Sequence, residues 1–237
     1  MNPTLTVIIP VFNERETILK ILDLVVAVDI DKEIIVVDDG STDSTVETLK
    51  AAETRYPGAQ MLYHDRNRGK GAAIRTALSK ARGRFTIIQD ADLEYDPKEY
   101  PQMLAPLLEG RTKAVYGSRI LGSNKARSYN RYYWGGRLLS FVTNILYASA
   151  ITDESTCYKA IETNMLRNLN LAAEGFEFCP EVTAKLLRAG VTIHEVPISY
   201  HPRSFEEGKK IKPKDGLIAI WTLIKYRFGK PPTYQAQ

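Results

Sequence analysis

The first part of the chain alternates short apolar runs with segments whose apolar residues recur at helical spacing. Residues 5–10 form a nearly continuous apolar run, which is typical of a strand buried on both faces, and residues 33–37, 61–63 and 85–89 repeat that pattern. The intervening helices are predicted from helical spacing or capping signals: one carrying Ile18, Ile21, Leu22 and Val25, one beginning near Thr42 with Ser44 and Glu47 at capping-box spacing, and one over residues 72–80. Strand and helix thus alternate three or four times within about 95 residues, which predicts an α/β fold with a mostly parallel, doubly wound sheet and helices on both faces.

The second part of the chain is less regular. Strands are predicted near residues 114–116, 156–160 and 192–197, and helices from near Gly136, from Pro180 to about residue 189, and over residues 217–228. No internal repeat and no linker-like composition interrupts the sequence. We therefore expect a single domain over residues 1–237, in which residues 215–237 are a C-terminal amphipathic helix and tail.

Two carboxylates follow the fourth apolar run. Asp90 and Asp92 are separated by one residue and stand where a strand is expected to end, ahead of a turn at residues 96–97. In an open α/β sheet, substrates bind beyond the carboxyl ends of the strands, and paired carboxylates there suit Mg²⁺ or Mn²⁺. An Asp-x-Asp pair is common by chance, however, and a solvated loop with a helix-capping Asp is the more frequent explanation when such a pair stands alone.

Bulk composition narrows the classes of function. Of the 237 residues, 44% are hydrophobic and 25% are charged, with a formal net charge of +4, which is ordinary for a soluble globular protein and gives no argument for nucleic-acid binding. Residues 12–14 lack the glycines of a dinucleotide fingerprint and residues 69–70 lack the earlier glycine of a P-loop, so neither site is expected. No apolar run approaches the ~20 residues that cross a bilayer. Cys157 and Cys179 are far apart without a zinc or redox spacing and are expected to be reduced thiols.

Four motifs within the first hundred residues stand in the order found in one enzyme family. They are Val7-Ile8-Ile9-Pro10-Val11-Phe12-Asn13-Glu14, Val36-Val37-Asp38-Asp39-Gly40-Ser41-Thr42-Asp43, Asn67-Arg68-Gly69-Lys70-Gly71 and Asp90-Ala91-Asp92. On these residues the chain resembles the family 2 glycosyltransferases of the glycosyltransferase A fold. Within that family it is most similar to the polyprenyl-phosphate branch, which includes dolichol-phosphate mannose synthase, on the strength of Gly117-Ser118-Arg119 and of Arg203 followed by Glu207-Gly208-Lys209-Lys210-Ile211.

The resemblance implies an inverting transfer of a hexose from a nucleoside diphosphate sugar, GDP-mannose or UDP-glucose, with Mg²⁺ or Mn²⁺. Residues 1–117 would form the nucleotide-sugar-binding half. The residues it places around the donor are Pro10, Phe12, Asn13, Glu14, Val37, Asp39, Ser41, Gly69, Lys70, Asp90, Ala91 and Asp92. It implies metal ligation by Asp90 and Asp92, with Glu94 closing the shell, and the metal would neutralise the leaving diphosphate. The residues themselves leave open a helix-capping role for Asp39 and a solvated side chain for Lys70.

Basic residues are dense in residues 118–214, the half that the resemblance assigns to the acceptor. Five of them follow one another without an acidic residue, and a later loop adds five more: Arg119, Lys125, Arg127, Arg131 and Arg137, then Arg203, Lys209, Lys210, Lys212 and Lys214. A run of cations is usually a solvated face, but two runs beside one site indicate an anionic partner. The resemblance implies a polyprenyl or dolichyl phosphate held by Arg119, Arg203 and either Arg137, which we prefer, or Arg131. Lys209 would grip the donor diphosphate, which makes Asp92, Arg119, Arg203 and Lys209 the expected catalytic residues.

Two alternatives remain open at this point. A phosphate monoester is anionic near neutral pH, because its second pKa is near ~6, and as an acceptor it needs no general base. A hydroxyl of a glycan, glycolipid or small molecule would need a carboxylate to take its proton, for which Asp153 or Glu154 is the candidate. The second alternative is a nucleotide-sugar-binding module without turnover.

Two amphipathic segments, residues 138–146 and 217–228, are informative about where in the cell the protein resides. Core packing is the commoner reason for such apolar stripes, but the basic flanks of the second segment also suit a helix lying in a membrane interface. We therefore expect a cytoplasmic protein that rests peripherally on the cytosolic face of a membrane through these segments.

Overall fold

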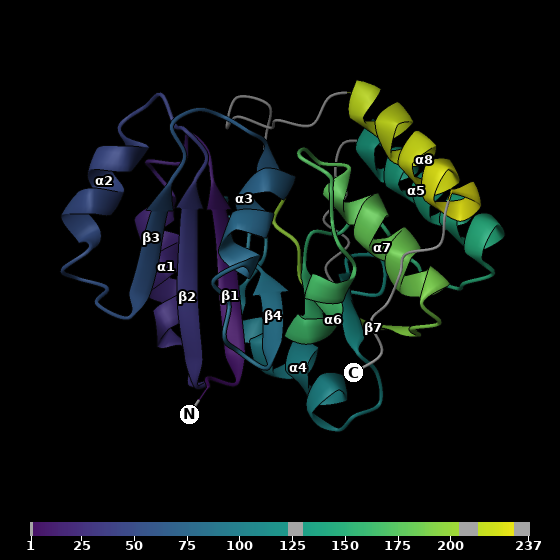
Figure 1. Cartoon of the computed structure of the whole chain (residues 1–237), viewed down its shortest axis with the longest axis horizontal. Coiled ribbons are helices and arrows are strands. Elements are labelled where there is room, and N and C mark those ends of the chain that lie inside the picture. The colour runs from purple at the N-terminus through teal and green to yellow at the C-terminus, as the bar shows by residue number, and fades with distance from the viewer. Residues whose placement is uncertain (1, 123–129, 204–212, 230–237) are drawn as a thin grey trace.

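Seven strands form one sheet in the order β3-β2-β1-β4-β6-β5-β7. The computed structural model describes residues 2–122, 130–203 and 213–229, and its strands are β1 (Leu5–Val11), β2 (Lys32–Asp38), β3 (Ala59–Tyr63), β4 (Phe85–Ile88), β5 (Ala114–Ser118), β6 (Lys159–Glu162) and β7 (Ile193–Pro197). β1 pairs in parallel with β2 and β4, β2 with β3, and β5 with β7, while β6 is antiparallel to both of its neighbours. The carboxyl ends of β1, β2 and β4 therefore lie together at one edge of the sheet (Figure 1).

Helices cover both faces of this sheet (Figure 1). They are α1 (Ile18–Ala27), α2 (Thr45–Ala52), α3 (Lys70–Leu78), α4 (Tyr100–Leu108), α5 (Asn130–Tyr147), α6 (Thr163–Asn168), α7 (Phe178–Arg188) and α8 (Pro213–Phe228), with a 3₁₀ turn, η1, at Pro97–Glu99. The helices α1 and α4 contribute to one buried apolar cluster, and α3, α6 and α7 contribute to a second.

The alternation of side chains along β2 shows why the sheet needs both layers. Ile34 and Val36 pack in the cluster with α1 and α4, whereas Ile35 and Val37 pack in the cluster with α3 and α7. Successive side chains of a strand point to opposite faces, so a continuous apolar run requires cover on both sides. The predicted doubly wound, mostly parallel α/β fold is confirmed.

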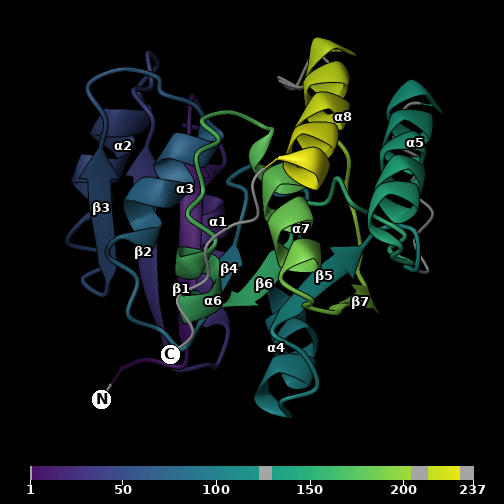
Figure 2. The same cartoon turned by 45° about the vertical axis from the view of Figure 1, so that its right-hand side comes forward.

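The helices α5, α7 and α8 form an outer layer beyond the second face of the sheet, and Figure 2 shows α7 between the sheet and α8. A small apolar cluster joins them, in which Leu139 of α5, Ala184 of α7 and Leu223 of α8 are buried. The predicted C-terminal helix is thus present as α8 and packs on the domain along one side. No helix in the described ranges is both long enough and apolar enough to cross a membrane.

Several element boundaries differ from those predicted. The strand expected at residues 156–160 is β6, which begins at Lys159 and runs antiparallel, and α5 begins six residues before the predicted start at Gly136. The capping box expected from Ser44 and Glu47 was wrong, because the Ser44 side chain makes no capping hydrogen bond. In its place the Asp43 carboxylate accepts the backbone N–H of Thr45 at 2.9 Å.

Candidate active site

The loops that follow β1 and β2 are tied together by one side chain. Asn13 has a left-handed backbone with φ of 53°, which Asn tolerates better than most residues. Its backbone N–H donates to the Ser41 hydroxyl at 2.9 Å, and its side-chain oxygen accepts the N–H of Thr42 at 2.8 Å. The two predicted donor-site residues Asn13 and Ser41 are therefore in direct contact across the strand ends.

Asp39 follows β2 and holds the loop in front of α3. Its side chain is 4% exposed, and its two oxygens accept the backbone N–H groups of Arg68 at 3.0 Å and Gly69 at 2.7 Å. Its neighbour Asp38 accepts the N–H of Ser41 at 2.9 Å, so the helix-capping role left open for Asp39 is not what the described residues show. An aspartate that fixes the backbone of this glycine-containing loop defines one wall of the site.

His64 stands at the end of β3 and supports Asp39. The Nδ1 atom lies 2.7 Å from an Asp39 oxygen and the Nε2 atom lies 3.0 Å from the Thr76 hydroxyl. With a proton on Nδ1, the ring donates to the carboxylate and accepts from the threonine, which fixes the Asp39 side chain from behind.

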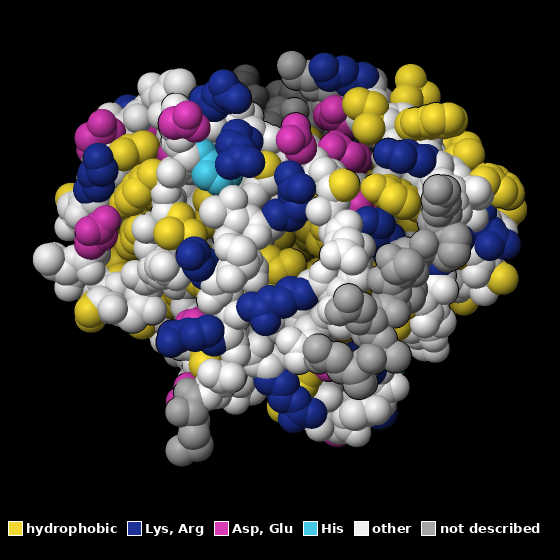
Figure 3. Space-filling view, in the orientation of Figure 1, with side chains coloured by type: hydrophobic (Ala, Val, Ile, Leu, Met, Phe, Trp, Pro, Cys, Tyr) yellow, Lys and Arg dark blue, Asp and Glu magenta, His cyan; other side chains and the backbone are white. Residues whose placement is uncertain are grey.

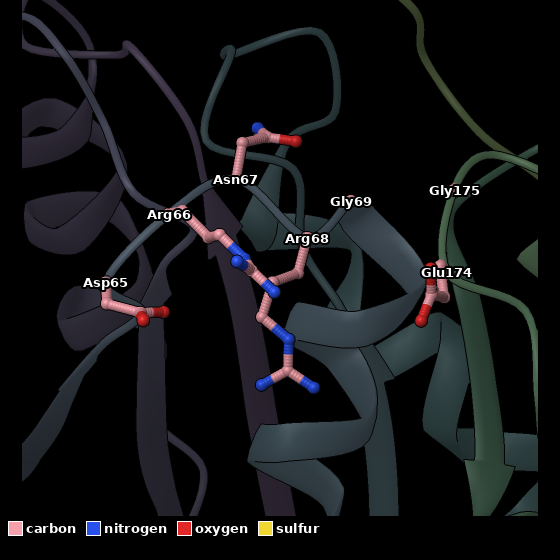
Figure 4. A pocket seen from close by; sticks show the side chains of 7 residues that line it. All are labelled: Asp65, Arg66, Asn67, Arg68, Gly69, Glu174 and Gly175. Carbon is pink, nitrogen blue, oxygen red and sulfur yellow. The ribbon is translucent and has the colours of Figure 1, made fainter.

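Gly69 is required where it stands. Its φ of +95° lies in the left-handed region that favours glycine, and a Cβ atom built there would lie 2.3 Å from the carbonyl oxygen of Glu174. A polar cavity of about 600 Å³ opens beside it, lined by Asp65, Arg66, Asn67, Arg68, Gly69, Glu174 and Gly175. Figure 4 shows the Arg66 and Arg68 side chains between Asp65 on one side and Glu174 on the other.

The carboxylate of Asp90 pairs with Lys70 across the site. The Lys70 ammonium contacts Asp90 directly and also donates to the Cys157 sulfur at 3.0 Å. Both charged side chains are mostly buried, with 14% of the Lys70 side chain and 15% of the Asp90 side chain exposed. Lys70 is thus an interior partner of Asp90, and the solvated role left open for it is not observed.

Asp92 pairs with an arginine from the other end of the chain. The Arg203 guanidinium lies 3.2 Å from an Asp92 oxygen and 2.7 Å from Glu14, which follows β1. Burial raises the pKa of Asp92, the negative charges of Asp90 and Glu94 raise it further, and Arg203 opposes them. Burial and neighbouring negative charge therefore both work against ionisation of Asp92.

Glu94 has partners that differ from those predicted. One of its oxygens accepts the backbone N–H of Arg203 at 2.9 Å, and the other accepts the Tyr200 hydroxyl at 3.0 Å. Metal ligation by Glu94 would replace one of these hydrogen bonds. In the described structure Glu94 positions the segment that carries Arg203.

The donor set nevertheless fits a divalent cation. Asp90, Asp92, Glu94 and Glu14 lie around the strand ends, and Lys70 and Arg203 are the cations paired with them in the described part of the chain. Across that part, no three His, Cys, Asp or Glu side chains form a ready-made metal shell. Mg²⁺ commonly takes one or two protein carboxylates and completes its coordination with water and substrate phosphates. Asp90 and Asp92 are suited to supply that protein share.

Arg119 and Asp153 form a further ion pair, on the side of the site assigned to the acceptor. Two guanidinium nitrogens of Arg119 donate to the two Asp153 oxygens, each at 2.7 Å, and one also reaches the Ser155 hydroxyl at 2.8 Å. Burial works against ionisation of Asp153, but Arg119 lowers its pKa below the ordinary value. The guanidinium also lies over the Tyr200 ring, 5.1 Å from its centroid, and so connects to Glu94 through that tyrosine.

Glu154 points into the interior and away from these partners. It is fully buried, and within the described ranges neither of its carboxyl oxygens has a hydrogen-bond partner. Burial raises the pKa of Glu154 to about 7, although the nearby Lys159 opposes the shift. A side chain with no exposed surface is out of reach for an acceptor hydroxyl.

Some of the remaining predicted residues lie at the strand ends, and the others take no part in the hydrogen bonds and ion pairs described above. Pro10 lies in β1, Val37 is buried in β2, Ala91 is buried between the two aspartates, and Phe12 is half-buried after β1. Arg137 is exposed on α5, one residue after Gly136, whose Cβ position lies 3.1 Å from the Ser155 hydroxyl. Lys209 and the side chain of Arg131 lie outside the described residues.

Four residues that contact the predicted site residues were not themselves predicted from the sequence. His64, Tyr200, Ser155 and Cys157 contact Asp39, Glu94, Arg119 and Lys70 respectively. A signal existed for His64, which directly follows β3 as Asp39 follows the neighbouring β2. The others are brought in by tertiary contacts that spacing along the chain does not reveal.

We predict that Glu154→Gln removes a pH dependence of stability. Because the folded-state pKa of Glu154 is raised to about 7, the folded protein holds a proton that the unfolded chain releases, so the free energy of unfolding falls as pH rises from about 4.5 to 7. That loss is at most about 3 kcal/mol. Urea unfolding at pH 5 and pH 8 should show the variant equal to the wild type at the lower pH and more stable at the higher one. Glu109→Gln, at an exposed position, is the control, and equal pH slopes in both variants would contradict the assignment.

Comparisons with known proteins identify the family to which the chain belongs. The family described as glycosyl transferase family 2 matches residues 6–169. The low-salt glycan biosynthesis hexosyltransferase Agl6 of Haloferax volcanii is 30% identical over 98% of this chain and 55% of its own length. The UDP-N-acetylglucosamine–dolichyl-phosphate N-acetylglucosaminyltransferase of Methanococcus voltae is 26% identical over 94% of this chain and 96% of its own length. The dolichol-phosphate mannosyltransferase of Pyrococcus furiosus is 26% identical over 93% and 64% of the two chains. This chain thus spans about half of the first relative and less than two thirds of the third.

Solved structures share the fold. Glucosyl-3-phosphoglycerate synthase from Mycobacterium tuberculosis, in complex with Mn²⁺, UDP and glucosyl-3-phosphoglycerate, superposes with a TM-score of 0.71 at 23% identity over 94% of this chain and 80% of that one. The mannosyltransferase PcManGT from Pyrobaculum calidifontis, in complex with GDP-Man and Mn²⁺, gives a TM-score of 0.60 at 19% identity over 95% and 70% of the two chains. With the family match covering more than half of the sequence, the conclusion is direct: this chain belongs to glycosyl transferase family 2 and is a glycosyltransferase.

Proposed function

We propose that the protein transfers a hexose from a nucleoside diphosphate sugar to a polyprenyl or dolichyl phosphate, with a divalent cation at Asp90 and Asp92. The observation that carries the acceptor class is the ion pair between Arg119 and Asp153, which engages both Asp153 oxygens. With Asp153 held in this way and Glu154 buried, neither of the two candidate bases is placed to take a proton from an acceptor, and the acceptor side offers an arginine. A phosphate monoester suits such a site because it is already anionic near neutral pH.

The relatives support the same acceptor. The Methanococcus voltae and Pyrococcus furiosus proteins are named for dolichyl-phosphate and dolichol-phosphate acceptors. The two solved structures contain Mn²⁺ with UDP in one case and with GDP-Man in the other, which supports a Mg²⁺ or Mn²⁺ site and leaves both nucleotides as donors to test.

On the donor side, we assign a role to each of the residues described above. Asp39, held by His64 and holding the loop at Gly69, gives the nucleotide a fixed wall beside the polar cavity. Asp90 and Asp92 hold the cation, which when bound supplies the positive charge that stabilises a leaving diphosphate. Lys70 keeps Asp90 in place until the cation binds.

On the acceptor side, arginines bind the phosphate. Arg119 is oriented by Asp153 and Ser155, and Arg203 is oriented by Glu14, so both guanidinium groups are fixed before an anion arrives. Arginine suits this task because its planar fork matches two phosphate oxygens. Arg137, exposed near Ser155, supplies a third positive charge, and Lys209 would act on the diphosphate.

The acceptor class is tested by turnover with Asp153→Asn. We expect the wild type with Mn²⁺ to use polyprenyl phosphate with GDP-mannose or UDP-glucose. The variant should raise the KM for the lipid phosphate, because Arg119 loses its charged partner, while kcat changes little. If Asp153 were a base for a hydroxyl acceptor, kcat would fall by about 100-fold or more. Unchanged nucleotide affinity in the variant is the control for folding, and a kcat loss of that size on lipid phosphate would contradict the proposal.

The outer layer supports contact with an anionic lipid surface. The helices α5 and α8 carry exposed apolar side chains on their outer sides, namely Trp134, Leu138, Phe141 and Ile145 on α5 and Leu217, Ile218, Trp221 and Phe228 on α8. Figure 3 shows apolar side chains gathered over these helices at the upper right. Exposed Lys214, Lys225 and Arg137 flank them, which complements the negative charge of phospholipid headgroups. We propose that this apolar face, shared by α5 and α8, rests on the membrane that holds the acceptor.

Vesicle flotation tests this contact. Removing α8 would expose the buried Leu139 and Ala184, so point substitutions are preferable to truncation. Phe141→Ser with Trp221→Ser should lower binding to phosphatidylglycerol vesicles by about tenfold or more, because each substitution removes a large apolar side chain from the interface. The matched control, Val26→Ser with Leu108→Ser, changes two exposed apolar side chains elsewhere and should bind as the wild type does. Equal flotation of the two double variants would refute the proposed face.

A further inference from the structure

Two cysteines that are 22 residues apart in the sequence are in contact with each other, and one of them contacts Lys70 of the donor site. Cys157 lies two residues before β6 and Cys179 is the second residue of α7, and their sulfur atoms are 3.7 Å apart. Both are thiols, and the chain contains two cysteines in all. Their sequence spacing matches no zinc or redox motif and gave no sign of a contact, but the fold brings them together.

The pair is connected to the donor site through one lysine. The Cys157 sulfur accepts a hydrogen bond from the Lys70 ammonium at 3.0 Å, and the same ammonium contacts Asp90. The ring of Phe176 lies 5.9 Å from that ammonium as a weaker neighbour. A change at the Cys157 sulfur therefore acts on the group that holds a proposed metal ligand.

The surroundings favour thiol chemistry. The hydrogen bond from Cys157 lowers the pKa of Cys179, and the charges of Lys159 and Lys70 act in the same direction against burial. Cys157 is half-buried as a residue and Cys179 is 7% exposed. The hydrogen bond to Cys179 and burial raise the pKa of Cys157, so the thiolate is favoured at Cys179. A thiolate is the reactive form of cysteine, and nearby cations favour it.

We propose that Cys157 and Cys179 are an oxidation site at which a hydroperoxide or a small disulfide converts two thiols into one disulfide. With hydrogen peroxide, the Cys179 sulfur attacks one oxygen, the O–O bond breaks, and a sulfenic acid and one water form. The Cys157 sulfur then attacks the Cys179 sulfur, the S–S bond forms, and the second water leaves with the remaining thiol proton. The sum is two thiols and one peroxide giving one disulfide and two waters.

The disulfide would alter the donor site through Lys70. Its sulfur atoms would have to approach from 3.7 Å to about 2.05 Å, and a disulfide sulfur at Cys157 would carry no negative charge to pair with the Lys70 ammonium. Lys70 would then keep Asp90 as its main partner and compete more strongly with a cation for that carboxylate. This consequence rests on the proposed function, because it takes Asp90 to be a metal ligand.

The site itself is tested by peptide mapping without reductant. The reduced protein is treated with hydrogen peroxide or oxidised glutathione, and a peptide joining Cys157 to Cys179 within one chain should appear and vanish with dithiothreitol. Cys179→Ala and Cys157→Ser should each lack it. Cysteines that remain fully alkylatable after treatment, or that form only chain-to-chain disulfides or glutathione adducts, would overturn the proposal.

The consequence is tested by nucleotide affinity. Titration of UDP and GDP in the presence of Mn²⁺ should give a Kd that is at least about threefold higher for the oxidised protein, a modest effect on the scale of one weakened contact. Reductant should reverse it, and Cys179→Ala should bind as the reduced wild type does with or without oxidant. An oxidised protein of unchanged affinity would overturn control of the donor site. A reduced protein that binds neither nucleotide would instead overturn the proposed function and leave the mapping result to decide the oxidation site.

Discussion

Like charges gathered at one edge of a sheet must be compensated, and the site of this protein depends on that constraint. Asp90 and Asp92 follow β4, Glu14 follows β1, and the strand order places these ends side by side. Their cations come from distant parts of the chain: Lys70 begins α3, and Arg203 follows β7. Pairing Arg203 with Glu14 and Asp92 ties the segment after β7 to the ends of β1 and β4.

The acceptor side also contains a buried ion pair, but there the positively charged residue is the one expected to bind the substrate. There an arginine is the group expected to meet the substrate, and Asp153 and Ser155 hold it in place. Tyr200 stands between the two sides, because its hydroxyl donates to Glu94 while its ring lies under Arg119. A carboxylate cluster suited to a cation therefore faces an arginine suited to an anion, which is the charge pattern that transfer from a diphosphate to a phosphate requires.

The sequence was most informative where local chemistry decides the structure. The apolar runs that became β1, β2 and β4 were predicted because a strand buried on both faces needs an almost unbroken apolar stretch. Asp90 and Asp92 were predicted as metal-binding candidates because they follow a strand, whereas the other donor-site candidates were implied by the family resemblance. The helix α4 was not predicted, although Tyr100, Met103, Leu104 and Leu107 are buried at helical spacing, because prolines at its first turn and at Pro106 weaken the signal.

What the sequence did not reveal are partnerships across the fold. Arg119 and Asp153 are 34 residues apart, and nothing in their spacing shows that the candidate base is held by the candidate phosphate ligand. The same holds for the two thiols, whose separation suggested no contact. Glu154 was grouped with Asp153 as a possible base because the two are adjacent. Both are buried, but Asp153 is paired with Arg119, whereas the carboxyl oxygens of Glu154 have no hydrogen-bond partner among the described residues. Pairing and burial depend on tertiary structure, so they separate residues that look equivalent along the chain.

The central claim is that Asp92 and Asp90 hold a divalent cation together with the donor diphosphate. Anomalous diffraction from crystals grown with Mn²⁺ and UDP or GDP measures this directly. We expect a manganese peak about 2.0–2.6 Å from an Asp92 oxygen, which is the range of metal–oxygen distances for such divalent ions. Diphosphate oxygens of the nucleotide should coordinate the same ion. A nucleotide bound at the strand ends with no manganese at Asp92 or Asp90, or manganese bound elsewhere in the protein, would contradict it.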